Sequence, residues 1–302
     1  MANIVKTEKS ANIAKFKSFL STESVQEQFR NALQDSSQLF VASLIDLVIS
    51  DDTLCECQPS LIIAEAFKAA TVRLPINKAL GFAYVIPYNK NVKVGNTWTK
   101  VPIPTFIMGY KGYIQLAMRT GQYRFINADV VYDGELVSRN KLSGAVDLSG
   151  QRKSEMIVGY FAYFELLNGF QKCLYWSTEE LTVHAQRRSP AYDQKAKKFN
   201  DKSSWATDFD AMAKKTMLRN LLSKFGVMSV EMQKAFDYDN DAVDTTLVGN
   251  TTLLPDADMP DAIPTVDIGN VADGQEDMQP REQVLPEELG DDDWPLADKA
   301  SE

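Results

Sequence analysis

The amino-acid sequence predicts an α+β fold: one core domain in which antiparallel β-hairpins are interleaved with helices, followed by a disordered acidic tail. In the first quarter of the chain, apolar residues recur at three- and four-residue steps, as on one face of a helix. Later segments alternate apolar and polar residues, and two of them are joined by Asn168-Gly169, which suits a tight hairpin turn. Residues 237–302 are rich in Asp, Glu, Pro and Gly without a sustained period.

Charge divides the chain in the same way. The formal net charge is −9, but residues 237–302 hold 19 acidic and 2 basic residues, which leaves 30 basic and 22 acidic residues in the first 236. An acidic segment with few aromatics cannot bury enough apolar surface to offset its chain entropy. We therefore predict a basic core over residues 1–236 and a disordered tail over residues 237–302.

Three helices are expected before the first hairpin. They are predicted over residues 24–33, 39–49 and 59–72. Pro59 suits a first helical turn, because the N–H that proline lacks would be unpaired there in any case. The next segments, 80–88 and 97–108, flank Gly95-Asn96 and predict a β-hairpin with an extended, lysine-bearing tip.

The second half of the core continues this alternation. A helix over residues 111–119 is expected to end before Gly121, and residues 125–132 are predicted as a strand. Residues 156–176, with Asn168-Gly169 at their centre, predict the second hairpin.

Two helices follow the second hairpin. Ser177-Thr178-Glu179-Glu180 fits a capping box that opens the first of them. The second is predicted over residues 205–225, capped by Ser203 or Ser204 and ended by Gly226. Its expected buried stripe is Trp205, Phe209, Met212, Thr216 and Leu221, which leaves Lys214, Lys215, Arg219 and Lys224 largely available to solvent or ligand.

A long stretch of the core lacks acidic residues. No carboxylate lies between Glu65 and Asp129, whereas nine basic residues do: Lys68, Arg73, Lys78, Lys90, Lys93, Lys100, Lys111, Arg119 and Arg124. Aromatic residues are interleaved with them: Phe82, Tyr84, Tyr88, Trp98, Phe106, Tyr110, Tyr113, Tyr123 and Phe125. Cations suit phosphates and rings suit unstacked bases, so the segment favours single-stranded nucleic acid. The alternative is that most rings belong to the core and the lysines are merely solvated.

Three groups of side chains are the candidate contacts. Lys111, Gln115 and Arg119 step by four residues and line one stripe of the predicted helix, with Gly112 beside it allowing close backbone approach. The second group is Lys214, Lys215 and Arg219, for which the alternative is a helix-dipole arrangement with an Asp210–Lys214 pair. The third group is a phosphate clamp or a soluble loop formed by Arg187, Arg188, Lys195, Lys197 and Lys198.

Other chemistries find less support in the sequence. No phosphate-binding P-loop motif occurs, which disfavours an ATP-driven recombinase. Cys55, Cys57 and Cys173 are expected to be reduced thiols, and with His184 they lack the usual spacing of a zinc site. A metal-dependent nuclease, the alternative function, would use Asp51, Asp52 and Glu56 or Asp129, Asp133 and Glu135, which look more like helix-end and turn residues.

Three ordered motifs carry a family likeness. They are Leu80-Gly-Phe-Ala-Tyr-Val-Ile-Pro-Tyr88, then Met108-Gly-Tyr-Lys-Gly-Tyr-Ile-Gln-Leu-Ala-Met-Arg-Thr-Gly-Gln122, then Trp205 followed by Met212-Ala-Lys-Lys-Thr216 and Arg219. From about residue 20 to residue 235 the chain resembles the RecT family of phage recombination proteins, whereas the tail matches only in being acidic.

The resemblance implies an ATP-independent, non-enzymatic protein that coats single-stranded DNA left by a partner 5′-to-3′ exonuclease and anneals it to a complementary strand as an oligomer or helical filament. It implies no required cofactor, with Mg²⁺ as a modulator of annealing. The matched basic positions are expected to hold backbone phosphates: Lys111, Arg119, Lys214, Lys215 and Arg219. The full set of predicted DNA contacts adds Lys93, Lys100, Tyr110, Tyr113, Gln115, Arg124, Arg187, Arg188, Lys197 and Lys198.

The tail and the N-terminus complete the sequence-based expectations. The tail is a solubilising segment, a competitor of DNA for the basic surface, or a docking peptide. In the third case Asp291-Asp-Asp-Trp-Pro-Leu296 looks like the acidic-then-apolar tip of bacterial single-strand binding proteins. The expected partner of the tail is then the host single-strand binding protein. No run reaches the roughly 18 uncharged apolar residues of a membrane span, and the N-terminus lacks the apolar segment of a signal peptide, so a cytosolic location is expected.

Overall fold

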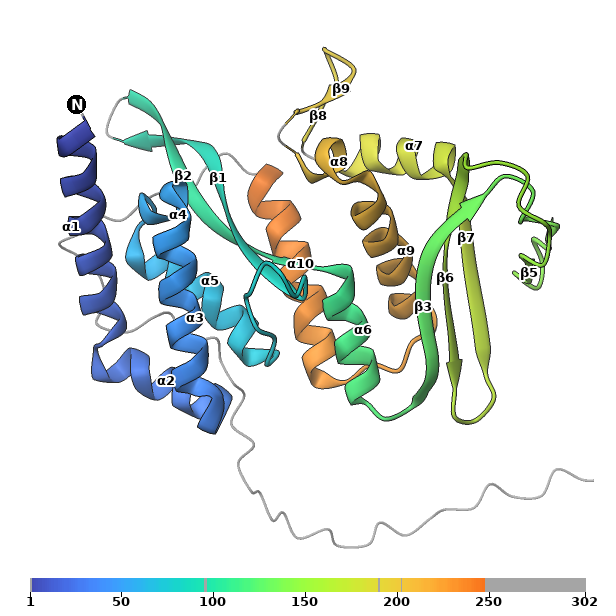
Figure 1. The fold of residues 1–302 in the computed structure, drawn as a ribbon, viewed down its shortest axis with the longest axis horizontal. Coiled ribbons are helices and arrows are strands. Elements are labelled where there is room, and N and C mark those ends of the chain that lie inside the picture. The colour runs from blue at the N-terminus through green and yellow to red at the C-terminus, as the bar shows by residue number, and fades with distance from the viewer. Residues whose placement is uncertain (1, 95–96, 190, 202, 248–302) are drawn as a thin grey trace, which may run out of the picture. The chain divides into compact units, whose positions relative to one another are not determined.

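The computed structural model describes residues 2–94, 97–189, 191–201 and 203–247, apart from the side chains of 2–8, 91–94, 98 and 241–247 (Figure 1). The predicted hairpin tip Gly95-Asn96 and residues 248–302 of the predicted acidic tail lie outside the described residues. Helices and antiparallel strands alternate along the described chain, which confirms the α+β prediction.

The N-terminal elements are helices around an apolar core. They are α1 (Ala2–Leu20), α2 (Glu23–Leu33), the 3-10 turn η1 (Gln34–Ser36), α3 (Ser37–Ser50), α4 (Asp52–Cys55) and α5 (Pro59–Thr71). The three helices predicted here are confirmed, including Pro59 in the first turn of α5. Helix α1 was not predicted, because its many lysines hide the spacing of the buried Phe16 and Leu20.

The segment Glu23–Ser50 is long and apolar enough, by length and composition alone, to cross a membrane. In the structure it is not one straight helix, because the chain turns at Gln34, which has a φ of 51°. On either side of that turn, Phe29 on α2 and Leu44 on α3 are fully buried in the protein core. Phe29 and Leu44 therefore pack within the protein, although Leu39 and Ile49 of the same segment are exposed.

A long two-stranded ribbon follows, formed by β1 (Ala83–Val94) and β2 (Thr97–Met108). Its register runs from Ala83 opposite Met108 to Val94 opposite Thr97, and Pro87 lies directly opposite Pro104. This confirms the first predicted hairpin. The register continues unbroken through this pair. Because proline has no N–H to donate, the two residues offer no donor at the ribbon's edges and discourage a further strand from joining it.

Helix α6 (Tyr110–Arg119) begins where the ribbon ends, and glycines set its position. A Cβ atom on Gly112 would lie 2.2 Å from the carbonyl oxygen of Phe82, and one on Gly109 would lie 2.1 Å from that of Gly81. The Gly109 N–H donates a hydrogen bond to the Phe82 oxygen at 2.9 Å. The close approach expected at Gly112 is therefore made by the protein's own backbone. As predicted, Gly121 follows the helix with a φ of 67°.

The C-terminal half is built on a three-stranded antiparallel sheet in the order β3-β6-β7. Its strands are β3 (Tyr123–Tyr132), β6 (Ile157–Leu166) and β7 (Gln171–Ser177), and the turn between β6 and β7 has Gly169 at a φ of 85°. The second predicted hairpin is thus confirmed. The short strands β4 (Ser138–Arg139) and β5 (Val146–Asp147) lie in the connection between β3 and β6.

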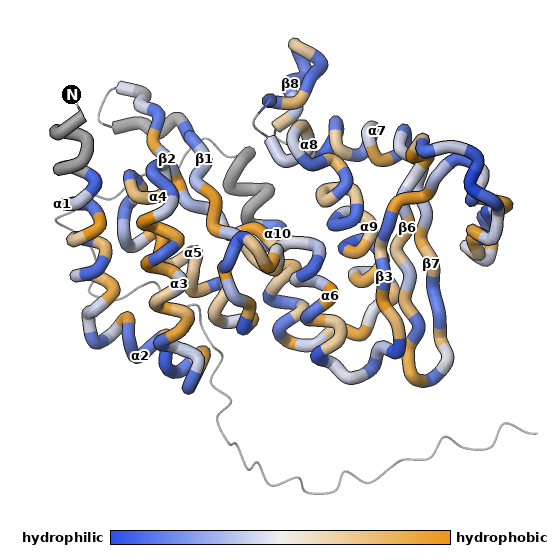
Figure 2. Tube along the Cα trace, viewed as in Figure 1, coloured by the Kyte–Doolittle hydropathy of each residue, from blue (hydrophilic) through white to orange (hydrophobic). Residues whose placement is uncertain are grey.

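Helix α7 (Thr178–Arg188) opens with the predicted capping box, in which the Ser177 hydroxyl accepts from the Glu180 N–H and the Glu180 carboxylate accepts from the Ser177 N–H. A small arm made of β8 (Tyr192–Asp193) and β9 (Lys198–Phe199) follows it. Apolar residues line the strands of the sheet and the helices against them (Figure 2). Buried side chains from α1 through α10 belong to one contiguous hydrophobic cluster.

The predicted last helix of the core is divided in two. Asp208 separates α8 (Ser204–Thr207) from α9 (Phe209–Phe225) and caps α9 by accepting from the Ala211 N–H. Of the predicted buried stripe, Trp205 and Leu221 are buried, whereas Phe209, Met212 and Thr216 are half-buried. The residues that α9 buries are Ala213, Met217, Leu218, Leu221 and Leu222. The reason is that α9 packs on both sides, against the sheet and against α6.

A further helix, α10 (Val230–Leu247), corrects the domain boundary predicted at residue 236. Phe236, Tyr238 and Asp239 are all buried, and the Tyr238 ring packs edge-on against Phe106 at 6.0 Å. The Tyr238 hydroxyl also lies 3.2 Å from that of Thr71 on α5. The acidic composition of this segment led to a prediction of disorder, whereas the segment forms a helix that packs on the core.

Truncated chains test whether the folded core ends at Phe236, as the sequence predicted, or at the end of α10. A chain ending at Phe236 loses Asp239, the buried partner of Lys215 and Arg219, and we expect it to be destabilised by about 3–5 kcal/mol or not to fold. A chain ending at Leu247 keeps α10 and should unfold near the urea midpoint of the full-length protein. Equal unfolding midpoints for both truncated chains would contradict this role of α10.

Candidate nucleic-acid interface

Five of the predicted contact residues are exposed and make no ion pair with another described residue. They are Lys100 on β2, Lys111 on α6, Arg187 and Arg188 in the last turn of α7, and Lys197 in the β8–β9 arm. The end of the β1–β2 ribbon and the β8–β9 arm project toward the same side, the upper edge in Figure 1. These cations can therefore meet an external polyanion without first giving up a partner.

The first turn of α6 presents Lys111 beside an aromatic surface. A Cβ atom on Gly81 would lie 3.2 Å from the Tyr84 hydroxyl and 3.4 Å from Cδ of Lys111. The aliphatic part of Lys111 therefore lies over the Gly81 turn while its ammonium group is in solvent. Tyr110 is half-buried and packs on the core, and burial raises the pKa of Tyr84.

Two other predicted contacts on α6 have internal roles. Tyr113 is fully buried, with its ring 5.2 Å from that of Phe236 and its hydroxyl donating to Asp239 at 3.0 Å. The prediction that Tyr113 touches DNA is therefore wrong, because its ring belongs to the core. The Arg119 guanidinium donates to the carbonyl oxygens of Val72 and Arg73 at 3.1 and 2.9 Å.

Three of the four basic residues of α9 differ most from the sequence-based expectation, because ion pairs hold Lys214, Lys215 and Arg219, whereas Lys224 is exposed as predicted. Lys214 pairs with Asp129 on β3 at 2.9 Å rather than with Asp210, whose carboxylate accepts from the Tyr160 hydroxyl at 2.6 Å. Lys215 pairs with Asp239 at 2.7 Å, and the side chains of Lys215 and Arg219 are 12% and 32% exposed. The sequence had suggested that these side chains are largely open to solvent, and this prediction is wrong for Lys215 and Arg219.

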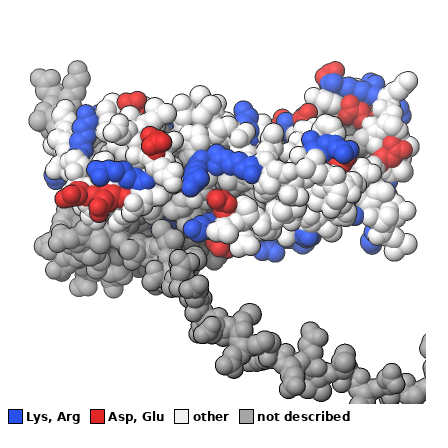
Figure 3. All heavy atoms as spheres, turned by 90° about the horizontal axis from the view of Figure 1, so that it is seen from below, with Lys and Arg blue, Asp and Glu red and all other residues white. Residues whose placement is uncertain are grey.

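The remaining predicted contacts are scattered. Arg124 pairs with Glu165 at 2.7 Å, Gln115 is half-buried, and Lys198 lies 3.9 Å from Asp201. The side chain of Lys93 lies outside the described residues. On the side shown in Figure 3, groups of basic residues are separated by acidic and neutral surface rather than joined in one band.

The base of the β8–β9 arm is a series of aromatic contacts. The Tyr192 and Phe199 rings lie 5.0 Å apart, and Phe199 stacks on Trp205 at 6.1 Å. Trp205 in turn meets Phe209 of α9 at 5.4 Å. The arm is therefore attached to the core by its rings, while Lys197 at its turn, with a φ of 51°, is exposed.

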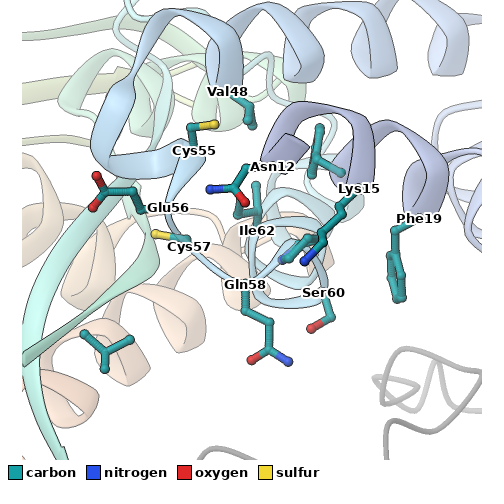
Figure 4. Close-up of a pocket in the computed structure, with 13 residues that line it drawn as sticks. Asn12, Lys15, Phe19, Val48, Cys55, Glu56, Cys57, Gln58, Ser60 and Ile62 are labelled. Carbon is teal, nitrogen blue, oxygen red and sulfur yellow. The ribbon is translucent and has the colours of Figure 1, made fainter. Parts of the chain in front are cut away.

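A cavity of about 550 Å³ lies between α1, the α4–α5 segment and β2 (Figure 4). Cys55 and Cys57 line it, together with Lys15 and Val101. Burial raises the pKa of the Cys57 thiol to about 12 and also raises that of Cys55, so both are protonated at neutral pH. Protonated thiols are poor nucleophiles and poor metal ligands.

The alternative nuclease carboxylates hold structural contacts. Asp51 caps α4 and pairs with Lys78, Asp52 pairs with Lys9, and Asp129 pairs with Lys214. Among the described residues, no group of three His, Cys, Asp or Glu side chains is placed to hold a metal ion.

Asp239 is the site residue that the sequence analysis missed. A signal was present, because Met232, Ala235, Phe236 and Asp239 follow the three- and four-residue steps of a helix face. The acidic composition around these residues outweighed that spacing.

Comparison with known proteins places this surface in a family context. The family model described as "RecT family" matches residues 38–248, a region that ends one residue beyond α10. The chain is 37% identical over 265 residues to uncharacterized protein YqaK of Bacillus subtilis (strain 168), covering 85% of each chain. It is 26% identical over 230 residues to protein RecT of Escherichia coli (strain K12), covering 74% of this chain and 79% of that protein.

Arg119→Ala tests the internal role of this side chain. Loss of the hydrogen bonds to the Val72 and Arg73 carbonyl oxygens should lower the free energy of unfolding by about 1 to 2 kcal/mol in urea titrations. Met118→Ala, at an exposed neighbouring position, is the matched control and should cost less. An Arg119→Ala protein as stable as this control would show that the two contacts do not hold α6 to α5.

Proposed function

This chain belongs to the RecT family of phage-type recombination proteins, and from that premise we propose that it binds single-stranded DNA and anneals complementary strands without ATP. The observation that carries the proposal is the family match over residues 38–248, which spans the described core from α3 to α10. The exposed cations without described ion pairs support it, because annealing requires only that phosphates be held.

The chemistry of annealing explains why such a surface suffices. Base pairing itself tests the sequence, so the protein must hold each strand by its backbone and leave the base edges accessible. Lysine and arginine side chains do this through phosphate contacts and counterion release, without reading bases. A surface that distinguished sequences would hinder the search for the complementary strand.

Annealing of long strands further requires several copies of the protein. A single subunit of a typical single-strand binder covers about 4 to 16 nucleotides, so neighbouring subunits must share one strand to align it with another. We propose that this chain acts as an oligomer or helical filament on DNA. Mg²⁺ would then modulate annealing by screening phosphates rather than by taking part in a reaction.

The proposed setting follows from the same chemistry. A 5′-to-3′ exonuclease would supply the single strands, and the protein would act on them in the bacterial cytosol. The acidic tail would offer a docking segment for the host single-strand binding protein or its partners.

Lys111→Ala and Arg188→Ala test the proposed contact surface. Each should weaken binding of oligonucleotides of any sequence. Log affinity falls as log salt rises, and each lost phosphate contact should make this negative slope shallower by about 0.7. Lys141→Ala removes an exposed cation in the β4–β5 connection and serves as the control. An unchanged salt slope in both test variants would remove these residues from the DNA surface.

Annealing itself is measured by mixing complementary labelled oligonucleotides with the full-length protein, with and without Mg²⁺ and without ATP. We expect faster duplex formation than in protein-free buffer and strands of unchanged length. Shortened strands in Mg²⁺ would favour a nuclease, and absence of both effects would contradict the proposed function.

A further inference from the structure

A buried charged cluster joins α6, α9 and α10. The Asp239 carboxylate, 5% exposed, accepts from Lys215 at 2.7 Å and from the Tyr113 hydroxyl at 3.0 Å, and it lies 3.4 Å from Nε of Arg219. The Arg219 guanidinium also donates to the side-chain oxygen of Asn240. Three helices therefore meet at one carboxylate.

The charges of this cluster do not balance. Among its described side chains, Lys215 and Arg219 contribute two positive charges and Asp239 contributes one negative charge. In addition, Nε of Arg219 is buried without a hydrogen-bond acceptor in good geometry. Because partly buried charge is costly without a partner, the excess positive charge favours a further anion.

The excess charge extends toward the solvent. Arg219 is the cluster's more exposed cation, at 32%. Burial and the positive charges of Arg188 and Arg219 lower the pKa of His184 on α7, so His184 lies in the field of both cations. An anion at Arg219 would therefore also lie in the field of Arg188, which belongs to the proposed DNA surface.

We propose that Asp239 tunes DNA affinity: Arg219 contacts a backbone phosphate, while Asp239 and Lys215 set the net charge behind it. This inference rests on the proposed single-strand binding. The Asp239 carboxylate repels a phosphate at Arg219 and so weakens binding, whereas Lys215 offsets part of that repulsion without touching the strand.

Such tuning suits an annealing protein. If Arg219 had no internal counter-charge, its phosphate contact would be stronger and dissociation of mismatched strands slower, because most affinity differences appear in the dissociation rate. The Asp239 carboxylate weakens the contact at Arg219, and many subunits together still retain the strand. The two strands can then shift until their bases match.

The test varies the cluster charge in four full-length proteins and measures binding to an oligonucleotide of mixed sequence at fixed salt. Lys215→Met leaves the cluster neutral, the wild type and the double variant Lys215→Met/Asp239→Asn carry one positive charge, and Asp239→Asn carries two. We expect Asp239→Asn to bind several-fold to about tenfold more tightly and Lys215→Met correspondingly more weakly. The double variant should recover most of the affinity lost in Lys215→Met.

Asp237→Asn is the matched control, because it makes the same change in total charge at an exposed position of α10. Its affinity should stay within about twofold of the wild type, since exposed charges are screened by salt. A double variant as weak as Lys215→Met would show that Lys215 itself holds DNA and would overturn the inference. So would equal tightening by Asp237→Asn and Asp239→Asn.

Folding and function are controlled separately. Thermal unfolding of each variant is measured first, and we expect Asp239→Asn to be less stable than the double variant because it leaves two buried cations without a counter-charge. If Asp239→Asn does not fold, the comparison of Lys215→Met with the double variant alone decides the inference. A wild-type protein that neither binds nor anneals DNA would instead contradict the proposed function.

Discussion

The buried interaction of Asp239 with Lys215, Arg219 and Tyr113 is the constraint on which the rest of the structure depends. It fixes α10 against α6 and α9, and these helices in turn position the ribbon and the sheet on either side. Two basic positions of the family motif are thus partly committed inside the protein. A positive residue in a family motif is therefore not by itself a surface contact with DNA.

The interface differs from the three groups of contacts that the sequence suggested. Arg124, Lys214 and Lys215 are neutralised by acidic partners, whereas Lys100, Lys111, Arg187, Arg188 and Lys197 are exposed without an ion pair to any residue that the structure describes. The second set lies on the ribbon, the start of α6, the end of α7 and the β8–β9 arm. Separate weak contacts of this kind can hold a strand and still let it move, which is what a search for complementary bases requires.

Local signals made much of the fold predictable from the sequence. Asn168-Gly169, the capping box at Ser177 and the glycine after α6 each act over a few residues, and all appear as expected. The environment of α9 and the extent of α10 depend on partners far away in the chain. Asp239 contacts Tyr113, which is 126 positions away in the chain, and the spacing of neighbouring residues cannot predict such a contact. For the same reason, the sequence could list the basic residues but could not divide paired from exposed ones.

The central claim is that this protein holds the sugar-phosphate backbone rather than the bases. Its most direct test compares binding of a normal oligonucleotide with that of an abasic one of equal length, over a range of salt concentrations. If the backbone alone is held, both oligonucleotides bind and log affinity falls with log salt at the same slope. Loss of binding to the abasic strand, or binding that ignores salt, would contradict this claim.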